Sequence, residues 1–355
     1  MICEFPDRVL KLVPEGSGHA DVERLIRDVT GDDSAVKITS IKGGITNQLL
    51  MAQQGSNKML VRAFGKGTST FIDRNREFAV HRQLTTLNLA PKLYCRFGNG
   101  LVYGFVEGRA TVYPELSHPD IISSVSSRLA QWHALLKIED VKKLLSPQPL
   151  GDLWSLLEDW IKQCPSGVLE MSKAEMAEEL EWFRSKYKSS NEGEVMGHCD
   201  LLASNILVPN AWDSSSEICT INRNDPSKSM ATFIDYEYAM PCPRSFDIAN
   251  HFQEWQGYDC DRSLVPNPLC DDKNLNDWVD HYIKAIKHFT GTVIGTVDQM
   301  IAELAVWWGM PGFYWGIWSA IQSTNSEIDF DYVNYARTRF EEYQIWKKTI
   351  YPNLR

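Results

Sequence analysis

Apolar residues along the chain follow two different periods, and the change between them divides the sequence. Val36–Ile41 alternates between apolar and polar residues as a strand does, and Leu49–Met51 and Lys58–Phe64 continue this pattern. An Asn-Gly pair at 99–100 separates two further apolar runs and predicts a hairpin. Beyond residue 106 the apolar spacing becomes helical. We therefore expect an α+β fold, with a small antiparallel sheet before a larger, mainly helical part.

Two long helices are predicted in this second part. One begins at Ser172, where Glu175 completes a capping box. The other carries an apolar stripe with spacings of three and four residues: Ile122, Val125, Leu129, Trp132 and Leu136. Such stripes are typical of buried core, so we assign them no chemistry.

Composition excludes several classes of protein. The chain has 355 residues, a formal net charge of −10 and a pI near 5.4, which argues against a broad nucleic-acid-binding surface. Its eight cysteines form no C-x-x-C pair, and Glu4, Asp7 and Arg8 interrupt any secretory leader. We therefore expect reduced thiols in a cytoplasmic protein. The uncharged run Leu304–Ile321 is interpreted as two buried helices broken at Pro311, not as a membrane span.

One polar loop carries a spacing typical of phosphoryl transfer. His198, Asp200 and Asn205 form H-x-D-x-x-x-x-N between two short apolar runs, and Asp235 and Glu237 follow a later one. In enzymes with a protein-kinase-like fold, this Asp is the base and this Asn a metal ligand. We expect His198 to brace the loop. The alternative is a polar loop that only joins two strands.

The strand-rich part contains features suited to a nucleotide. Arg62 lies within an apolar strand, and Glu77 shares the inward stripe of the following helix, so the two can pair. The alternative is an Arg at a strand end and a solvated Glu. A glycine turn precedes them, and small residues there would let backbone N–H groups approach phosphate oxygens. Its candidate residues are Gly44, Ile45, Thr46 and Asn47.

Aromatic residues and a carboxylate suggest a site for a cationic group. Trp315 and Trp318 share one helical face, and aromatic rings with carboxylates attract an ammonium group. The alternative is that these rings are ordinary core. The further candidates are Tyr238, Glu254, Phe330 and Tyr335.

Consecutive blocks from about residue 40 to 345 resemble the choline and ethanolamine kinases. These blocks are LVRAFG, DRNREF, APKLYCRFGNGLVYGF, GHCDLLASNIL, FIDYEYA, RSFDIANHFQEW and WGIWSAIQ…IDFDYVNYARTRFEEY. The resemblance implies a two-lobed, protein-kinase-like fold that phosphorylates an amino alcohol with ATP and Mg²⁺. The expected parts are an N-terminal extension (1–35), a nucleotide-binding lobe (36–106) and a catalytic and substrate-binding lobe (107–355).

By position, the resemblance implies a role for each candidate. Arg62 and Glu77 would be the ion pair of the nucleotide lobe, and Asp200 the base. Asn205 and Asp235 would hold metal, with Glu237 beside them. Tyr238, Glu254, Trp315, Trp318, Phe330 and Tyr335 would line the amino-alcohol pocket.

The preferred acceptor is ethanolamine. Leu201-Leu202 and the IDFDY block look more like the ethanolamine branch, and the product would serve phosphatidylethanolamine synthesis. The alternatives are a choline or dual kinase, a non-catalytic amino-alcohol sensor and a metal-dependent hydrolase. A homodimer is one option for its assembly. Two departures stand out: Cys199 replaces a usual Asn, and Gly104 a common acidic residue of the adenine hinge.

Overall fold

The computed structural model describes residues 2–12, 19–41, 48–65, 72–190, 192–215 and 222–354. The chain divides into two compact units, Met1–Glu107 and Gly108–Arg355, which we describe separately. The strands are β1 Cys3–Phe5, β2 Val36–Ser40, β3 Gln48–Gln54, β4 Asn57–Ala63, β5 Leu93–Phe97, β6 Gly100–Gly104, β7 Arg109–Ala110, β8 Glu194–Gly197, β9 Ile206–Val208, β10 Thr232–Phe233 and β11 Met240–Pro243. The helices are α1 His19–Thr30, α2 Arg74–Thr86, α3 Pro119–Leu135, α4 Ile138–Leu145, α5 Leu153–Gln163, α6 Lys173–Ser189, α7 Arg244–Gln253, α8 Lys273–Thr290, α9 Val297–Trp307, α10 Met310–Asn325 and α11 Tyr332–Ile345.

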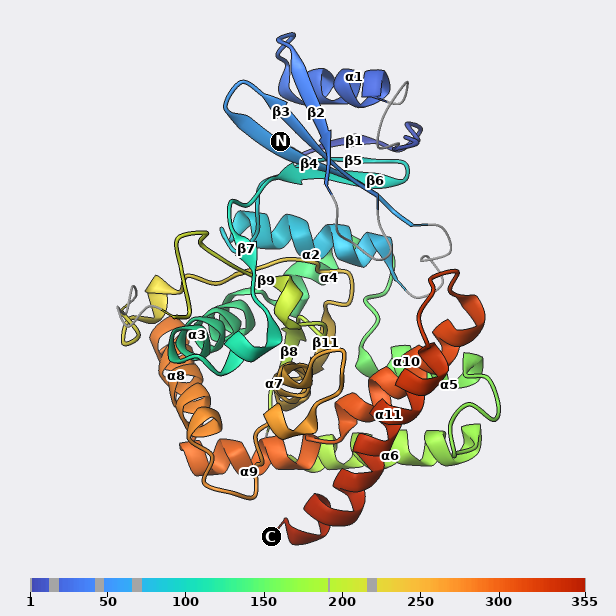
Figure 1. Ribbon diagram of the computed structural model, residues 1–355, viewed down its shortest axis with the longest axis vertical. Helices are drawn as coiled ribbons and strands as arrows, with labels where there is room; N and C mark the ends of the chain where they lie inside the picture. The colour runs from blue at the N-terminus through green and yellow to red at the C-terminus, as the bar shows by residue number, and fades with distance from the viewer. Residues whose placement is uncertain are drawn as a thin grey trace. The chain divides into compact units, whose positions relative to one another are not determined.

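The N-terminal unit is a six-stranded sheet in the order β1-β5-β6-β4-β3-β2. Strands β2 to β6 pair antiparallel, as expected, and the Asn-Gly hairpin joins β5 to β6. The edge strand β1 departs from that expectation because it pairs parallel with β5. Figure 1 shows α1 and α2 on opposite faces of this sheet. Residues 1–35, which we expected to form an extension, therefore contribute β1 and α1 to this unit within their described part.

Alternation along β4 divides its side chains between these two helices. Met59 and Val61 are fully buried in one apolar cluster with Leu25 and Ile26 of α1. Burying such side chains contributes about 1.5–3 kcal/mol each. Since successive side chains point to opposite faces, Arg62 faces the other side of the sheet, where α2 lies.

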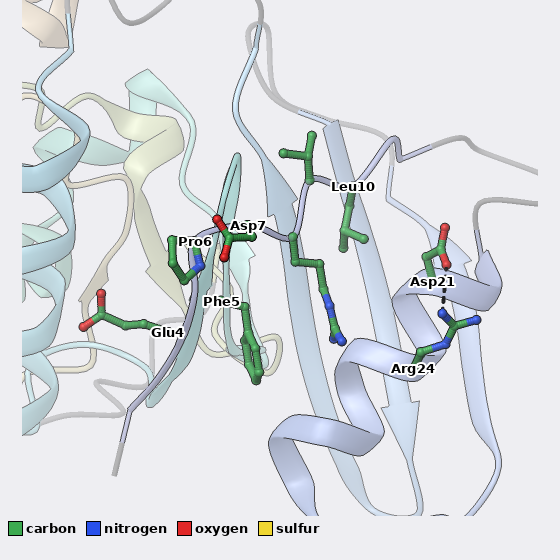
Figure 2. A pocket seen from close by; sticks show the side chains of 9 residues that line it. Glu4, Phe5, Pro6, Asp7, Leu10, Asp21 and Arg24 are labelled. Atoms are coloured by element: carbon green, nitrogen blue, oxygen red, sulfur yellow. Dashed lines mark ion pairs between the residues drawn. The ribbon is translucent and has the colours of Figure 1, made fainter.

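The amino-terminal strand and α1 also border a hollow of about 610 Å³. Residues 4–10 line it together with Asp21 and Arg24, which form an ion pair of 3.8 Å on α1 (Figure 2). Its lining includes none of the residues that the sequence assigns to nucleotide or acceptor binding.

The C-terminal unit is mainly helical, with α3 beside α8 and α10 beside α11 (Figure 1). Val125, Leu129 and Trp132 of the predicted apolar stripe are fully buried in α3. The capping box of α6 is confirmed. The Ser172 hydroxyl accepts from the backbone N–H of Glu175, and the Glu175 carboxylate accepts from the backbone N–H of Ser172.

The uncharged run 304–321 forms the end of α9 and most of α10, with Pro311 in the first turn of α10. Proline suits this position because its missing N–H would have no helical partner there. Among the described residues, no helix is both long and apolar enough to cross a membrane.

Most described residues of the polar segment 210–229 are exposed, but Trp212 and Arg223 attach it to α3. Trp212 is 4% exposed, and its indole N–H donates to Asp120 of α3 at 3.4 Å. Arg223 donates to the other oxygen of Asp120 at 2.6 Å. These contacts tie the described part of the segment to α3.

Candidate active site

Two loops of the C-terminal unit meet because their flanking strands pair. Residues 198–205 connect β8 to β9, and residues 234–239 connect β10 to β11. Strand β9 pairs with β10, and β8 pairs with β11, both antiparallel. This topology brings the H-x-D-x-x-x-x-N loop beside the loop that carries the later acidic pair.

Asp247 of α7 holds the backbone at the start of the first loop. Its carboxylate accepts from the amide N–H groups of His198 at 3.0 Å and Cys199 at 2.7 Å. His133 lies 2.9 Å from the same carboxylate, and its other ring nitrogen lies 2.7 Å from the Tyr282 hydroxyl. Although burial opposes ionisation, the hydrogen bond and charge of His133 and the Cys199 amide lower the pKa of Asp247.

The next turn of α7 continues this support. Asn250 donates to the carbonyl oxygen of Cys199 at 2.9 Å. The His251 Nδ1 lies 2.9 Å from the carbonyl oxygen of Leu201 and therefore donates to it, while Nε2 accepts from the Trp255 indole at 3.3 Å. Residues 247, 250 and 251 lie on one helical face, so one side of α7 fixes the loop. Sequence reasoning assigned no role to these residues.

Both loops contain a residue in the left-handed backbone region. Cys199 has φ +60° and Asp235 has φ +65°. This conformation is costly for residues with a β-carbon and persists where the surroundings fix it. At Cys199 two hydrogen bonds fix it: the amide N–H donates to Asp247, and the carbonyl accepts from Asn250. The family resemblance suggests Asn at this position.

Asp200 lies in an acidic environment and contacts the loop asparagine. Asn205 donates from Nδ2 to the Asp200 carbonyl at 2.8 Å and to its carboxylate at 3.1 Å. Burial, followed by the charges of Asp235, Glu254 and Glu237, raises the pKa of Asp200 well above its usual range. These side chains therefore lie close enough to repel one another.

The acidic pair of the second loop offers hard oxygen ligands. Carboxylate oxygens of Asp235 and Glu237 lie within 4.8 Å of each other. Asn205 directs its amide nitrogen to Asp200, which leaves Oδ1 as its potential ligand atom. One amide and two carboxylate oxygens suit Mg²⁺. As expected, His198 braces the loops: its Nε2 lies 3.1 Å from the carbonyl oxygen of Ile234.

Three of the acceptor candidates, Tyr238, Trp315 and Trp318, form one aromatic group. The rings of Trp315 and Trp318 lie 5.5 Å apart, and that of Tyr238 lies 5.7 Å from Trp315. The Trp318 indole donates to the Tyr238 hydroxyl at 2.9 Å. Burial and the charges of Glu237 and Asp200 raise the pKa of Tyr238, which therefore stays protonated.

The remaining acceptor candidates belong to the same neighbourhood. The Trp315 indole donates to Asn250 at 2.8 Å, linking this aromatic group to α7. Phe330 is 43% exposed and lies 5.5 Å from the Tyr335 ring. Tyr335 and Glu254 both contact Arg339, a buried residue that sequence reasoning did not single out. From sequence alone, a charged residue in a helix is most simply interpreted as facing solvent, and only the tertiary structure shows that Arg339 is buried.

In the N-terminal unit, the expected ion pair is present. Arg62 donates to Glu77 at 2.7 Å, and Arg74 donates to the other carboxylate oxygen at 2.7 Å. Although burial favours the neutral acid, the two guanidinium groups lower the pKa of Glu77. The turn residues Gly44, Ile45, Thr46 and Asn47 lie outside the described residues.

Comparisons with known proteins extend over most of the chain. A family model named choline/ethanolamine kinase matches residues 38–344. A protein named probable ethanolamine kinase from Nematostella vectensis is 32% identical over 327 residues, which cover 86% of this chain and 86% of the relative. Ethanolamine kinase 1 of Mus musculus is 29% identical over 332 residues, covering 88% and 84%.

A solved structure shows the same architecture. The ethanolamine kinase of Plasmodium vivax is 26% identical, with a TM-score of 0.72 over 90% of this chain and 85% of its own. The predicted α+β, protein-kinase-like fold is therefore confirmed. With the family model matched from the nucleotide-lobe strands to the last long helix, the chain belongs to the choline/ethanolamine kinase family.

Proposed function

We propose that this protein is an ethanolamine kinase, which transfers the γ-phosphoryl group of ATP to the hydroxyl of ethanolamine and forms phosphoethanolamine for phospholipid synthesis. One observation carries the proposal. In a single unit, Asp200 accepts a hydrogen bond from Asn205, and the charges of Asp235, Glu237 and the acceptor candidate Glu254 act on it. A base between metal ligands and a cation site suits phosphorylation of an amino alcohol.

Asp200 is the proposed base. The ethanolamine oxygen forms a bond to the γ-phosphorus, the bond from that phosphorus to the β–γ bridging oxygen breaks, and Asp200 accepts the hydroxyl proton. The products are phosphoethanolamine and ADP. Asn205 orients Asp200 through its hydrogen bond to the carboxylate. Holding the hydroxyl, phosphate and base in line supplies most of the rate enhancement in such reactions.

Asn205 Oδ1, Asp235 and Glu237 are the proposed ligands of Mg²⁺. The bound ion would neutralise phosphate charge during transfer. It would also offset the repulsion between the carboxylates around Asp200.

The N-terminal unit is proposed to bind the nucleotide. Arg62 is held by Glu77 and would contact the phosphates of ATP. The turn at Gly44, Ile45, Thr46 and Asn47 would cover those phosphates with backbone N–H groups.

The ammonium group is proposed to lie among the rings of Tyr238, Trp315 and Trp318, with Glu254 as its counter-charge and Phe330 and Tyr335 at the edge. A primary ammonium can donate hydrogen bonds to a carboxylate, whereas choline relies on ring faces. Choline is therefore the second candidate acceptor.

The two sequence features of the ethanolamine branch have different surroundings. Leu202 is half-buried at the start of the 3₁₀ turn that leads to Asn205. Asp331 caps α11 by accepting from the Asn334 amide at 3.0 Å. Its effect on acceptor choice would therefore act through the position of α11.

The test is an acceptor panel with purified protein, ATP and Mg²⁺, in which phosphoethanolamine is identified by ³¹P NMR. Ethanolamine should accelerate ADP release well above the rate without acceptor. Phosphate release that needs neither an acceptor nor ATP would support a hydrolase, and amino-alcohol binding without turnover would support a sensor. Either result would refute the proposed function.

We also propose a cellular location and an oligomeric state. Free thiols at Cys95, Cys164 and Cys242 suit a reducing compartment, so we propose a cytoplasmic location. We also propose a homodimer. Light scattering tests it, because a monomer has a mass of 40.5 kDa.

A further inference from the structure

Arg339 of α11 is a charged residue with no exposed surface. A buried guanidinium group is strongly unfavourable unless carboxylates and hydrogen bonds compensate it. Its Nη1 donates to Glu254 at 2.9 Å and to the Tyr335 hydroxyl at 2.8 Å, and its Nε donates to Glu342 at 3.0 Å. One arginine therefore joins two carboxylates and a phenol.

Two of these three partners are the acceptor-site residues Glu254 and Tyr335. Both bonds come from the same nitrogen, so this atom fixes the position of the Glu254 carboxylate relative to the Tyr335 hydroxyl. Glu254 uses Oε1 for this bond, which leaves Oε2 for a substrate ammonium. Glu254 is also close enough to Asp200 to affect its ionisation.

Arg339 itself is held in place by helix packing. A β-carbon on Gly312 of α10 would lie 2.5 Å from the Arg339 carbonyl oxygen, so α10 and α11 approach closely at this point. Trp315 and Trp318 are on the same helix α10. The packing therefore relates the position of Arg339 directly to that of the aromatic rings.

The carboxylates around Arg339 keep it protonated, and its positive charge partly offsets the negative charge of Glu254. Burial lowers the pKa of Arg339, but Glu342 and Glu254 outweigh this effect, and the net shift is upward. The formal charges of Arg339, Glu254 and Glu342 sum to −1. Glu254 is thus an oriented, partly compensated carboxylate.

We propose that Arg339 is a positioning residue that sets acceptor selectivity, because it orients Glu254 and Tyr335 for a primary ammonium group. This inference rests on the proposed function. Hydrogen bonds from a primary ammonium to a carboxylate depend on direction, so displacement of Glu254 should weaken ethanolamine binding. A trimethylammonium group has no N–H and binds to ring faces, so the same displacement affects choline less.

The main test is Arg339→Lys, which retains the charge but loses the planar fork that joins Glu254, Tyr335 and Glu342. We expect the KM for ethanolamine to rise about tenfold, and the ratio of kcat/KM for ethanolamine over choline to fall about tenfold. The KM for ATP should stay within about twofold. Where choline turnover is too slow, its inhibition constant replaces kcat/KM.

Arg337→Lys is the matched control, because Arg337 is an exposed arginine of the same helix that donates only to the Val168 carbonyl among described residues. It should leave all constants unchanged. Should Arg339→Lys fail to fold, Tyr335→Phe keeps the ring and removes the bond to Arg339. It should shift the acceptor ratio in the same direction by a smaller factor.

Equal losses of kcat/KM with ethanolamine and choline, or an unchanged ratio, would overturn the inference and leave Arg339 a structural residue. That outcome is distinct from failure of the proposed function, which would appear as a lack of ethanolamine phosphorylation by the wild-type protein.

Discussion

Asp200 is the proposed base, and its ionisation also affects the free energy of folding. Burial and the nearby charges of Asp235, Glu254 and Glu237 raise its pKa, so its ionisation opposes folding. The direction of the pH dependence follows from the difference in bound protons between the folded and unfolded chains. The stability associated with this carboxyl is present at low pH and is lost as pH rises through the raised pKa.

Asp200→Asn should therefore lower turnover about 100- to 10,000-fold yet raise the melting temperature of the nucleotide- and metal-free protein. The difference in melting temperature should be larger at pH 8 than at pH 5, where the wild-type carboxyl is closer to protonation. Thermal unfolding at both pH values measures it. A variant less stable than wild type at pH 8 would contradict this account.

Charged residues explain much of what the sequence could and could not predict. Arg62 and Glu77 were predictable as a pair, because the strand pattern places Arg62 among apolar residues and the helix pattern places Glu77 on the inward face. Arg339 and Asp247 were not, because spacing alone does not distinguish a buried charge from a solvated one. Only packing shows that Asp247 contacts the candidate catalytic loop and that Arg339 contacts the acceptor candidate Glu254.

At the scale of elements, α7 supports the candidate site through hydrogen bonds to the backbone of the first loop. Asp247, Asn250 and His251 bind the backbone of the first loop, and Glu254 follows one turn later at the acceptor side. The loop was recognisable from its own residues, whereas its support comes from a helix more than forty residues later. Local pattern therefore identified the candidate loop, whereas long-range hydrogen bonds from α7 fix its backbone.

Asp247→Asn should destabilise the protein by about 3 kcal/mol. The Asn amide has one uncharged oxygen, whereas the two carboxylate oxygens of Asp247 accept from the His198 and Cys199 N–H groups. We expect kcat to fall at least about tenfold, because the base is displaced. Urea unfolding and steady-state kinetics measure both effects.

Asp280→Asn provides the control, because Asp280 is a surface residue paired with Lys284 on α8. Such exposed pairs contribute about 0–1 kcal/mol. Similar losses of stability in the two variants would argue against α7 as the support of the loop.

At the scale of the whole molecule, each unit contains a buried neutral histidine. Burial lowers the pKa of His81 and of His251 to about 4. Both rings donate to a backbone carbonyl, those of Pro91 and Leu201. In His251 the other nitrogen accepts from the Trp255 indole, so a second ring proton would have no acceptor there.

The stability from these neutral histidines is present above pH 6.5 and is lost as pH falls from 6.5 towards 4, because the unfolded chain takes up protons first. For His251 this amounts to about 2 kcal/mol between pH 8 and pH 5. His251→Gln should be less stable at pH 8 but should lose less on acidification. Equal pH slopes in urea unfolding would refute this assignment.

Over the whole molecule, the sequence predicted the change from a small antiparallel sheet to a mainly helical part, because the apolar period changes between them. It missed the parallel edge strand β1, which is only three residues long. The apolar run before Asp235 forms only the two-residue strand β10, and the Ala231 carbonyl accepts from Arg128 at 2.9 Å. Short strands depend on partners that local sequence does not specify.

The central claim is that this chain phosphorylates ethanolamine in preference to choline. The most direct measurement is kcat/KM for the two amino alcohols with the purified protein at saturating ATP and Mg²⁺. We predict that kcat/KM for ethanolamine exceeds that for choline by at least about tenfold. A higher value for choline, or ADP release that neither alcohol accelerates, would contradict the account.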